Sequence, residues 1–191
     1  MSSPPPSRRP RADAARNRER LVAAARTAFA SGTDEPSLEA VARAAGVGIG
    51  TLYRHFPTRQ DLVAAVYGSE LDAVLAGVDD LLAEHDGRRA LRTFASQYAS
   101  FVATKREMAE VVRTTAIRAA AETVQTRERV NAAIARFLEQ GAADGSLRDD
   151  LRADDVTAAL VGVLLGARDR ESDPEQVDRV LDIVVAGLAR D

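Results

Sequence analysis

Apolar residues recur every three or four positions along almost the whole chain, which is the spacing of one face of an α-helix. No stretch alternates apolar and polar residues over a useful length, so the pattern predicts no β-sheet. Breaks rich in Gly, Pro, Ser and Asp separate the apolar stripes and divide the chain into about nine helices. The hydrophobic pattern therefore predicts an all-α fold.

The first predicted helix follows an N-terminal segment of different composition. Residues 1–12 are rich in Pro, Ser and Arg, so we expect a disordered basic arm. Asp13 is placed to cap the helix that follows, and Ser31-Gly32-Thr33 ends it. The apolar face of this helix consists of Leu21, Ala24, Ala25, Ala28 and Phe29. It is expected to support the two short helices that come next.

A second helix is predicted to begin at Pro36-Ser37, because a serine hydroxyl can accept a hydrogen bond from an N–H of the first helical turn. Its apolar face is formed by Leu38, Val41 and Ala45. Gly46 follows at the point where a positive φ is needed, and Val47 is expected to pack back onto the core.

A third helix carries Leu52 and Phe56 four residues apart on one face, and Pro57 stops it. Helix, glycine turn and second helix are the layout of a helix-turn-helix. In that motif the second helix lies in the major groove of DNA. The segment from Ser37 to Arg59 is therefore the candidate functional site of the chain.

The spacing of Thr58 and Asp61 is that of a capping box and predicts the start of a long fourth helix. Its apolar stripe runs through Leu62, Val66, Leu71, Val74, Leu75, Val78 and Leu81 or Leu82. A helix of this length extends from the helix-turn-helix into the rest of the chain and could transmit motion between the two halves.

The middle of the chain also has a helical pattern, from Gly87 onward. Apolar residues at helical spacing are Leu91, Phe94, Tyr98 and Phe101. A break is expected near Thr104, followed by a short helix over Glu107–Arg113. A longer helix is expected over Val124–Ala143, ending around Asp144-Gly145.

The last two helices are predicted to be apolar on more than one side. Residues 156–167 carry a complete apolar stripe, and Asp173-Pro174-Glu175 starts the final helix. A helix that is apolar on two sides buries both, so one side would serve the chain's own core and the other a second copy. The alternative is a core formed wholly within one chain. The dimer-interface candidates are Leu160, Val161, Leu164, Leu165, Arg168, Val177, Val180, Leu181, Val184 and Leu188.

Composition restricts the chemistry that the chain can perform. Of its 191 residues, 46% are hydrophobic and 29% are charged, as in a globular rather than a disordered protein. There is no cysteine, which excludes a disulfide scaffold, a thiol nucleophile and a thiolate metal site. The longest apolar run has 12 residues, too short to cross a bilayer, and no signal peptide fits the start. We expect a cytoplasmic protein with no membrane partner.

The charge is unevenly distributed. The net charge is −3, but residues 1–70 hold 10 Arg and 7 acidic residues, a net +3, and residues 71–191 carry a net −6. A basic excess around the helix-turn-helix suits a protein that meets phosphate at one end, although ordinary scatter is an alternative. The composition shift places a domain boundary near residue 70.

Two sequence segments resemble the DNA-binding domain of the tetracycline-repressor (TetR) family of transcriptional regulators. They are AVARAAGV from Ala40 to Val47 and GTLYRHF from Gly50 to Phe56, followed by Arg59 and Leu62. The resemblance is close over the first third of the chain. It implies a three-helix helix-turn-helix domain over residues 13–70 and a helical ligand-binding and dimerisation domain over residues 71–191.

The resemblance puts Tyr53 and His55 at positions that commonly contact the DNA backbone. A phenol hydroxyl and an imidazole N–H are suitable phosphate donors, and Arg54 can reach phosphate or a guanine edge. Each side chain here could instead be a solvated surface residue. The full set of candidate DNA contacts is Ser37, Arg43, Gly48, Ile49, Gly50, Thr51, Tyr53, Arg54, His55 and Arg59.

Some of these candidates keep two interpretations. Gly48 and Gly50 let backbone N–H groups approach phosphate or base, and Ile49 either touches a thymine methyl or packs. The arginines of residues 8–11 either enter the minor groove, as homeodomain arms do, or belong to a solubilising tail.

The resemblance also implies a small-molecule cavity among the middle helices. The candidate lining residues are Phe94, Tyr98, Phe101, Met108, Arg113, Thr114, Arg118, Gln125, Asn131 and Phe137. A packed core is the alternative for the aromatic stripe.

No catalytic or metal-binding constellation is found in the sequence. The run Gly46 to Gly50 lacks the third glycine of a dinucleotide-binding loop, because Tyr53 stands there. The only histidines, His55 and His85, are too far apart in pattern to share a zinc ion, and no G-x-S-x-G occurs. We expect no enzyme activity, no metal and no cofactor.

The resulting hypothesis is a ligand-responsive repressor that binds a palindromic double-stranded DNA operator as a homodimer and is released by a small-molecule effector. One alternative is a member of the same family that activates, or that answers to a protein partner. A more distant alternative is a helical enzyme or scaffold with an incidental helix-turn-helix.

Overall fold

The computed structural model describes residues 9–30, 37–112, 116–166 and 175–190, and describes side chains for 12–29, 37–102, 124–164, 166 and 175–190. These residues form the helices α1 to α9, and none of them forms a strand, which confirms the all-α class. The chain divides into two compact units, Met1–Ser69 and Glu70–Asp191. Each unit is described by itself.

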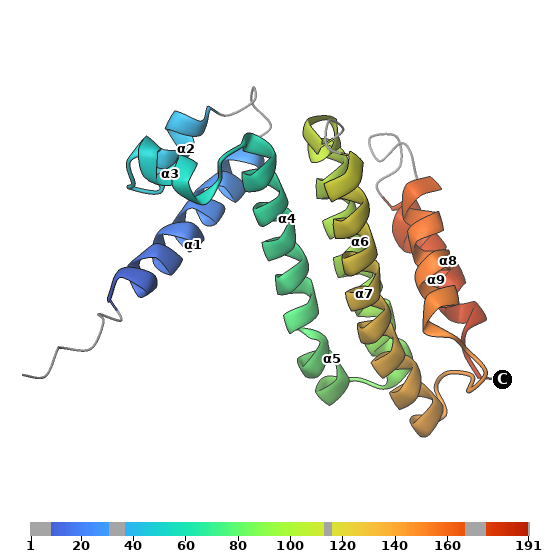
Figure 1. The fold of residues 1–191 in the computed structure, drawn as a ribbon. Helices are drawn as coiled ribbons and strands as arrows, with labels where there is room; N and C mark the ends of the chain where they lie inside the picture. The colour runs from blue at the N-terminus through green and yellow to red at the C-terminus, as the bar shows by residue number, and fades with distance from the viewer. Residues whose placement is uncertain (1–8, 31–36, 113–115, 167–174, 191) are drawn as a thin grey trace, which may run out of the picture. The chain divides into compact units, whose positions relative to one another are not determined.

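The first unit contains α1 (Arg9–Ala30), α2 (Leu38–Ala44), α3 (Ile49–His55) and the beginning of α4 (Arg59–Ala76). α1 packs against α2 and α3, and Figure 1 shows the two short helices lying together on one side of it. The core of the unit is apolar and fully buried, and consists of Leu21, Ala25, Val41, Leu52, Phe56 and Leu62. The predicted apolar faces of α1, α2 and α3 therefore meet in one small core.

α1 begins earlier than the sequence predicts. It starts at Arg9, so residues 9–12 belong to the helix and not to a disordered arm. Pro10 lies in the first turn, where the missing N–H would have no helical partner and the fixed φ suits the helix. Arg8 and the expected end of the helix at residues 31–33 lie outside the described residues.

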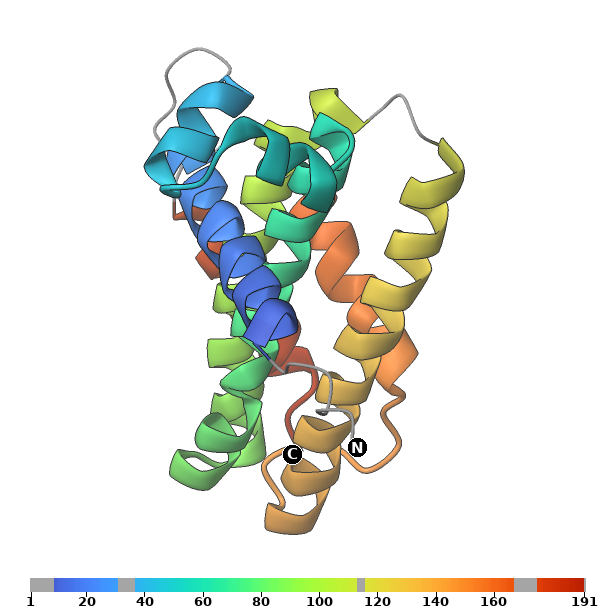
Figure 2. The same cartoon turned by 60° about the vertical axis from the view of Figure 1, so that its left-hand side comes forward.

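The second unit holds the end of α4 with α5 (Val78–Glu84), α6 (Gly87–Val112), α7 (Ala116–Asp144), α8 (Ala153–Gly166) and α9 (Gln176–Gly187). α6 packs against α5, α7, α8 and α9. Figure 2 shows these long helices running beside one another. The largest buried side chains of the unit are Leu71, Leu91, Phe94, Ile134, Phe137, Leu147, Leu160 and Leu181.

Three predicted helix boundaries in this part of the chain are wrong. The predicted fourth helix is divided at Gly77 into α4 and α5, because glycine is about 1 kcal/mol less favourable in a helix than alanine. α6 is continuous to Val112, with no break near Thr104, since one polar turn does not end a helix. α7 begins at Ala116 rather than Val124, in an alanine-rich segment that favours a helix without an apolar stripe.

The start of α6 contacts the end of α7 at two glycines. A Cβ on Gly87 would collide with the backbone N and Cα of Gly141 and lie 2.8 Å from the carbonyl oxygen of Phe137. A Cβ on Gly141 would in turn lie 2.5 Å from Cδ1 of Leu147. The two backbones can approach this closely only because Gly87 has no side chain, and the missing side chain of Gly141 leaves room for Leu147.

Asp144 caps the start of α6. Its Oδ2 accepts a hydrogen bond from the N–H of Gly87 at 2.8 Å, and its Oδ1 accepts one from the N–H of Ser146 at 2.9 Å. Desolvation would raise the pKa of Asp144, but hydrogen bonds from the Ser146 hydroxyl and from these two N–H groups outweigh it. The pKa is therefore held below its ordinary value of 3.8.

Polar contacts spaced along α7 hold the end of α4 and α5. Arg129 pairs with Asp72 at 2.6 Å, and Arg136, seven residues later, pairs with Asp79 at 2.5 Å. One helical turn further, Nε2 of Gln140 donates to the carbonyl oxygens of Leu82 and His85 at 3.0 and 2.8 Å. The amide thereby satisfies carbonyl groups that the end of α5 leaves without helical partners.

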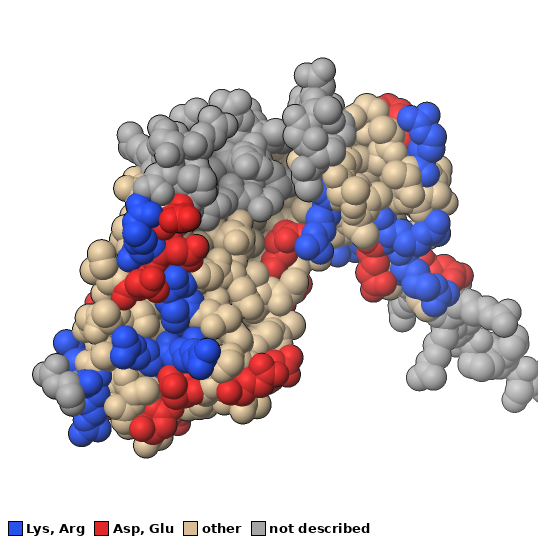
Figure 3. All heavy atoms as spheres, turned by 180° about the vertical axis from the view of Figure 1, so that it is seen from behind, with Lys and Arg blue, Asp and Glu red and all other residues tan. Residues whose placement is uncertain are grey.

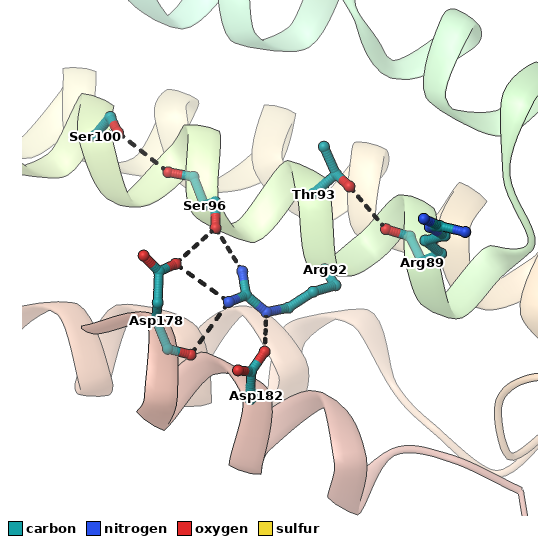
Figure 4. Close-up of polar contacts among 7 residues, drawn as sticks. All are labelled: Arg89, Arg92, Thr93, Ser96, Ser100, Asp178 and Asp182. Atoms are coloured by element: carbon teal, nitrogen blue, oxygen red, sulfur yellow. Dashed lines mark hydrogen bonds and ion pairs between the residues drawn. The ribbon is translucent and has the colours of Figure 1, made fainter. Parts of the chain in front are cut away.

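A second polar cluster joins α6 to α9 (Figure 4). Nε of Arg92 lies 2.5 Å from Oδ1 of Asp182, and Nη2 lies 3.2 Å from both Oδ1 and the carbonyl oxygen of Asp178. The Ser96 hydroxyl donates to Asp178 at 3.0 Å. Desolvation would lower the pKa of Arg92, but the hydrogen bonds and charges of the two carboxylates outweigh it and raise that pKa. Arg92 therefore stays charged and fixes α9 on α6.

Candidate nucleic-acid interface

The turn between α2 and α3 is closed by a Schellman motif. The N–H of Gly46 donates to the carbonyl oxygen of Arg43 and the N–H of Val47 to that of Ala42, both at 3.0 Å. Gly46 has a φ of 65°, as this motif requires of the residue after the helix cap. The predicted glycine turn of the helix-turn-helix is confirmed.

Both helices of the motif begin at the expected residues. The hydroxyl of Ser37 accepts a hydrogen bond from the N–H of Ala40 at 3.1 Å and so caps α2. Gly48 caps α3 through its carbonyl oxygen, which accepts from Thr51 at 2.8 Å. The role of Ser37 in this structure is therefore a cap, and a DNA contact through its hydroxyl stays a prediction.

The recognition helix α3 has one buried and one exposed face. Leu52 is 0% and Phe56 2% exposed, so both belong to the core. Tyr53 is 46% and Ile49 38% exposed, although both are large apolar or aromatic side chains. Exposed large side chains on a helix held rigidly from behind are what a groove-binding surface requires.

The exposed face also carries Gly50, Thr51 and Arg54. Arg54 lies back along its own helix, with Nε donating to the carbonyl oxygen of Gly50 at 3.2 Å and Nη2 to Oγ1 of Thr51 at 3.1 Å. A Cβ added at Gly48 or Gly50 would meet no described atom within 4 Å. The backbone at the start of α3 is therefore open to a close approach from outside.

The end of α3 and the start of α4 are also fixed. The His55 ring, half-buried, lies 6.3 Å from the Phe56 ring. Oδ2 of Asp61 accepts hydrogen bonds from the N–H and the hydroxyl of Thr58 at 3.1 and 2.8 Å, and the N–H of Asp61 donates back to Thr58 at 3.1 Å. This capping box is the one that the sequence predicts.

Arg59 is placed differently from the prediction. Its Cζ lies 5.7 Å from the centre of the Phe29 ring on α1, and its Nε and Nη2 atoms are buried. This position favours a packing role in the first unit over the predicted phosphate contact. Arg43, by contrast, is exposed on α2.

Two arginines of α1 that the sequence analysis did not select contact the helix-turn-helix. Cζ of Arg18 lies 5.3 Å from the centre of the Phe56 ring, and the guanidinium of Arg20 lies against Gly46. The sequence did offer a signal for Arg18. It lies three residues before Leu21 and seven before Ala25, so it continues the apolar stripe of α1 toward the N-terminus.

On the face seen in Figure 3, the basic and acidic side chains of the second unit lie interspersed. Exposed pairs such as Arg152 with Asp154 illustrate this mixing.

The aromatic ligand candidates form a packed core. Phe94 lies 6.1 Å from Tyr98 and 5.2 Å from Phe137, and Tyr98 lies 5.7 Å from Phe101, between ring centres. All four are buried, and burial raises the pKa of the Tyr98 hydroxyl. The core interpretation, left open by the sequence, is therefore favoured for these four rings.

The polar ligand candidates are only partly described. Gln125 is exposed. Asn131 is half-buried, and its buried Oδ1 accepts no hydrogen bond from any residue the structure describes. The side chains of Met108, Arg113, Thr114 and Arg118 lie outside the described residues.

The dimer candidates divide into two groups. Leu160, Leu164, Val177 and Leu181 are buried within their own chain, which corrects their assignment to the interface, since the i, i+4 stripe that they form serves the intrachain core. Val161, Val180, Val184 and Leu188 are half-buried. Ile183, which is also on α9, is 70% exposed. Leu165 and Arg168 lie outside the described side chains.

The described residues contain no group of three or more His, Cys, Asp or Glu side chains placed to hold a metal ion. None of the described helices is long and apolar enough to span a bilayer.

A three-helix unit that presents the second helix of a helix-turn-helix to the outside defines a helix-turn-helix DNA-binding protein. Comparison with known families agrees with this class. Residues 21–66 match the family described as "Bacterial regulatory proteins, tetR family", and residues 86–190 match "Transcriptional regulator SbtR-like, C-terminal domain". The chain belongs to the TetR family of transcriptional regulators.

Solved structures of similar proteins cover nearly the whole chain. The TetR transcriptional regulator SCO0520 from Streptomyces coelicolor is 35% identical with a TM-score of 0.72, over 91% of this chain and 98% of that one. A TetR transcription regulatory protein from Mycobacterium vanbaalenii is 28% identical with a TM-score of 0.69, over 94% and 98%. Both domains thus share the arrangement of known family members.

Similarity to curated proteins is shorter. The HTH-type transcriptional regulator SAR0097 of Staphylococcus aureus (strain MRSA252) is 31% identical over 80 residues, which are 41% of this chain and 42% of that protein. The chain thus matches less than half the length of this curated relative.

Proposed function

We propose that this protein is a ligand-responsive transcriptional repressor that binds a palindromic operator as a homodimer and acts in the cytoplasm. The observation that carries the proposal is the exposed face of α3. Tyr53 and Ile49 are exposed on it, whereas Leu52 and Phe56 are buried in the core of the unit. In a two-fold dimer, two such helices would enter successive major grooves about 34–36 Å apart.

Within this interface we assign different tasks to neighbouring side chains. Tyr53 and His55 would donate to phosphate, which fixes position and carries no sequence information. Arg54 would leave its contacts with Gly50 and Thr51 and turn to a base edge, because a guanidinium can bind guanine through two hydrogen bonds. The cost of releasing Arg54 is small, since both contacts are exposed and within one helix.

The response to a ligand would come from the second unit. An effector that binds one conformation of this unit more tightly than another shifts the population toward it and lowers operator affinity by the same coupling free energy. The buried Oδ1 of Asn131, which accepts no hydrogen bond from a described residue, supports a polar contact inside this unit that a ligand could satisfy.

The proposal is tested by selecting duplexes from a random library with the purified protein and sequencing those retained. We expect a palindrome with two half-sites about one helical turn apart. Tyr53→Phe and His55→Ala should weaken binding to all selected duplexes alike, whereas Arg54→Ala should reduce the preference at one base position. Retention of no duplex over background would refute the proposal.

A reporter gene under the selected operator separates repression from activation. Deletion of the regulator should raise expression if it represses. A fall in expression would instead establish the activating alternative, with the same DNA interface.

A further inference from the structure

Two arginines of α1 contact the helix-turn-helix at its two ends. At one end, Cζ of Arg18 lies 5.3 Å from the centre of the Phe56 ring. Phe56 is the residue that closes α3, with its N–H donating to the carbonyl oxygen of Leu52 at 2.8 Å. At the other end, a Cβ on Gly46 would lie 2.5 Å from Nη2 of Arg20. The turn before α3 and the cap after it are thus both touched from α1.

Both contacts have a physical basis. A guanidinium above an aromatic ring is attracted by the negative face of the ring. The guanidinium of Arg20 lies at the C-terminal end of α2, where the partial negative charge of the helix dipole is concentrated. Neither arginine forms a hydrogen bond or ion pair with another residue that the structure describes in this unit.

α1 is itself fixed to the neighbouring helix. Phe29 lies eleven residues after Arg18, which is about three helical turns and hence on the same side of α1. Its ring is covered by Arg59 at the start of α4, at 5.7 Å. The link between α3 and α4 is therefore held against α1 at both of its ends, by one cation–π contact on each side.

These contacts lie on the packed side of α3. Leu52 and Phe56 form the buried face, whereas Tyr53 and Ile49 are exposed. A duplex approaching the exposed face would meet Tyr53, and Arg18 would lie behind the helix on the ring of Phe56. Arg18 is therefore suited to orient the helix and not to contact phosphate.

We infer that Arg18 and Arg20 are positioning residues that set the orientation of the recognition helix on α1. The inference rests on the proposed function, since it concerns how α3 meets its operator. A misoriented α3 would lose contacts to base edges, which need fixed geometry, and would keep the electrostatic attraction of the unit to any duplex. Specific affinity should fall while non-specific affinity stays.

The test compares Arg18→Met, Arg18→Lys and Arg20→Met with the wild-type protein. Arg16→Met is the matched control, because Arg16 lies on the same helix and its ion-pair partner among the described residues is Asp13, one turn away. Each protein is titrated by fluorescence anisotropy against a duplex selected by the wild type and against a scrambled duplex of equal length, at several KCl concentrations. Active fractions come from stoichiometric titration and thermal stability from circular dichroism.

We expect Arg18→Met and Arg20→Met to lower affinity for the selected duplex roughly two- to five-fold, the factor expected for an exposed cation–π or helix-end contact. Affinity for the scrambled duplex and the slope of log affinity against log salt should not change, because no phosphate contact is lost. Arg18→Lys should recover most of the loss, since it keeps a cation over the ring. Arg16→Met should behave as wild type.

Several results would overturn the inference. If the slope of log affinity against log salt fell by the amount expected for one phosphate contact, the arginine would be shown to bind phosphate. An equal loss on both duplexes, or a lower active fraction, would show a role in stability only. A lysine variant as weak as the methionine variant would contradict the cation–π basis. Unchanged specific affinity would refute positioning while the proposed function stands, whereas a wild type without duplex preference would refute both.

Discussion

At the scale of single residues, the first unit depends on a few positions that each meet more than one structural requirement. Gly46 is the clearest, because it combines a φ of 65° with the guanidinium of Arg20 where a side chain would begin. Phe56 is another, since it closes α3, fills the core and carries Arg18 on its ring. These residues stabilise the turn before α3 and the cap after it.

Gly46→Ala should destabilise the protein by roughly 1–2 kcal/mol, the cost of a left-handed conformation for a residue with a Cβ, with an added cost for displacing Arg20. Thermal unfolding followed by circular dichroism measures the change. Gly50→Ala is the matched control, because it lies within α3 with open space around it. It should stabilise the free protein by about 0.5–1 kcal/mol. A Gly46→Ala variant as stable as wild type would contradict the geometry of the turn.

The cap formed by Asp144 predicts a pH dependence. Its pKa in the folded protein is lowered, so its stabilisation is complete above the ordinary carboxyl pKa of 3.8 and is lost as the pH falls through the folded value. Asp144→Asn should therefore be less stable than wild type at neutral pH, and the two should converge in acid. Urea unfolding between pH 2 and pH 7 checks this, and a difference that stays constant down to the acid end would refute it.

At the scale of elements, the short helices were predictable from sequence and the long ones only in part. The apolar faces, the serine cap, the glycine turn and the capping box are local signals, and α2, α3 and the start of α4 follow them. The predicted break near Thr104 and the predicted late start of α7 were wrong, because a helix can continue through a polar turn or an alanine-rich segment on its residues' helix propensity.

The candidate site was also only partly predictable from the sequence. The exposed Tyr53 and buried Leu52 follow from helical spacing. The packing of Arg59 on Phe29 and of Arg18 on Phe56 was not predictable, because both contacts join residues on different helices whose crossing is not encoded by any local pattern. The internal burial of Leu160 and Leu181 likewise depends on which neighbour covers each face.

Two polar contacts between α5 and α7 are expected to contribute differently to the stability of the protein. Arg136 and Asp79 form an exposed ion pair, and such pairs contribute about 0–1 kcal/mol. Gln140 donates to two part-buried carbonyl groups at the end of α5, and its loss leaves both unsatisfied. Gln140→Ala should destabilise by about 1–3 kcal/mol and Arg136→Ala by less than about 1 kcal/mol. Urea unfolding measures the free energy of unfolding of both variants. A larger loss for Arg136→Ala than for Gln140→Ala would refute this ranking.

At the scale of the whole molecule, the family assignment and the two compact units agree. The family description of the first unit covers residues 21–66 and that of the second covers residues 86–190, and the division of the chain falls between them at Ser69. The exposed face of α3 and the aromatic core thus belong to different units, and the boundary between the units falls within α4.

The proposed homodimer predicts that α9 contributes its exposed side. Ile183 is 70% exposed, and burying such a side chain against a second copy would stabilise association by about 1.5–3 kcal/mol. Ile183→Arg should weaken the dimer in sedimentation-velocity experiments and lower affinity for the full palindrome. Val124→Arg, at a residue 59% exposed on α7, is the control and should leave the dimer intact. A dimer unaffected by Ile183→Arg would place the interface elsewhere.

The glycine contact between α6 and α7 limits how the second unit can deform. Because the two backbones touch at Gly87 and Gly141, the helices cannot separate at this end without breaking the Asp144 cap. A change in the angle between α6 and α7 would therefore pivot about this contact. Phe101 lies fourteen residues along α6, about 21 Å away, so a tilt of about 5° would shift that level by roughly 2 Å. A small change in the angle between the two helices at Gly87 and Gly141 would therefore move the aromatic rings near Phe101 by roughly 2 Å.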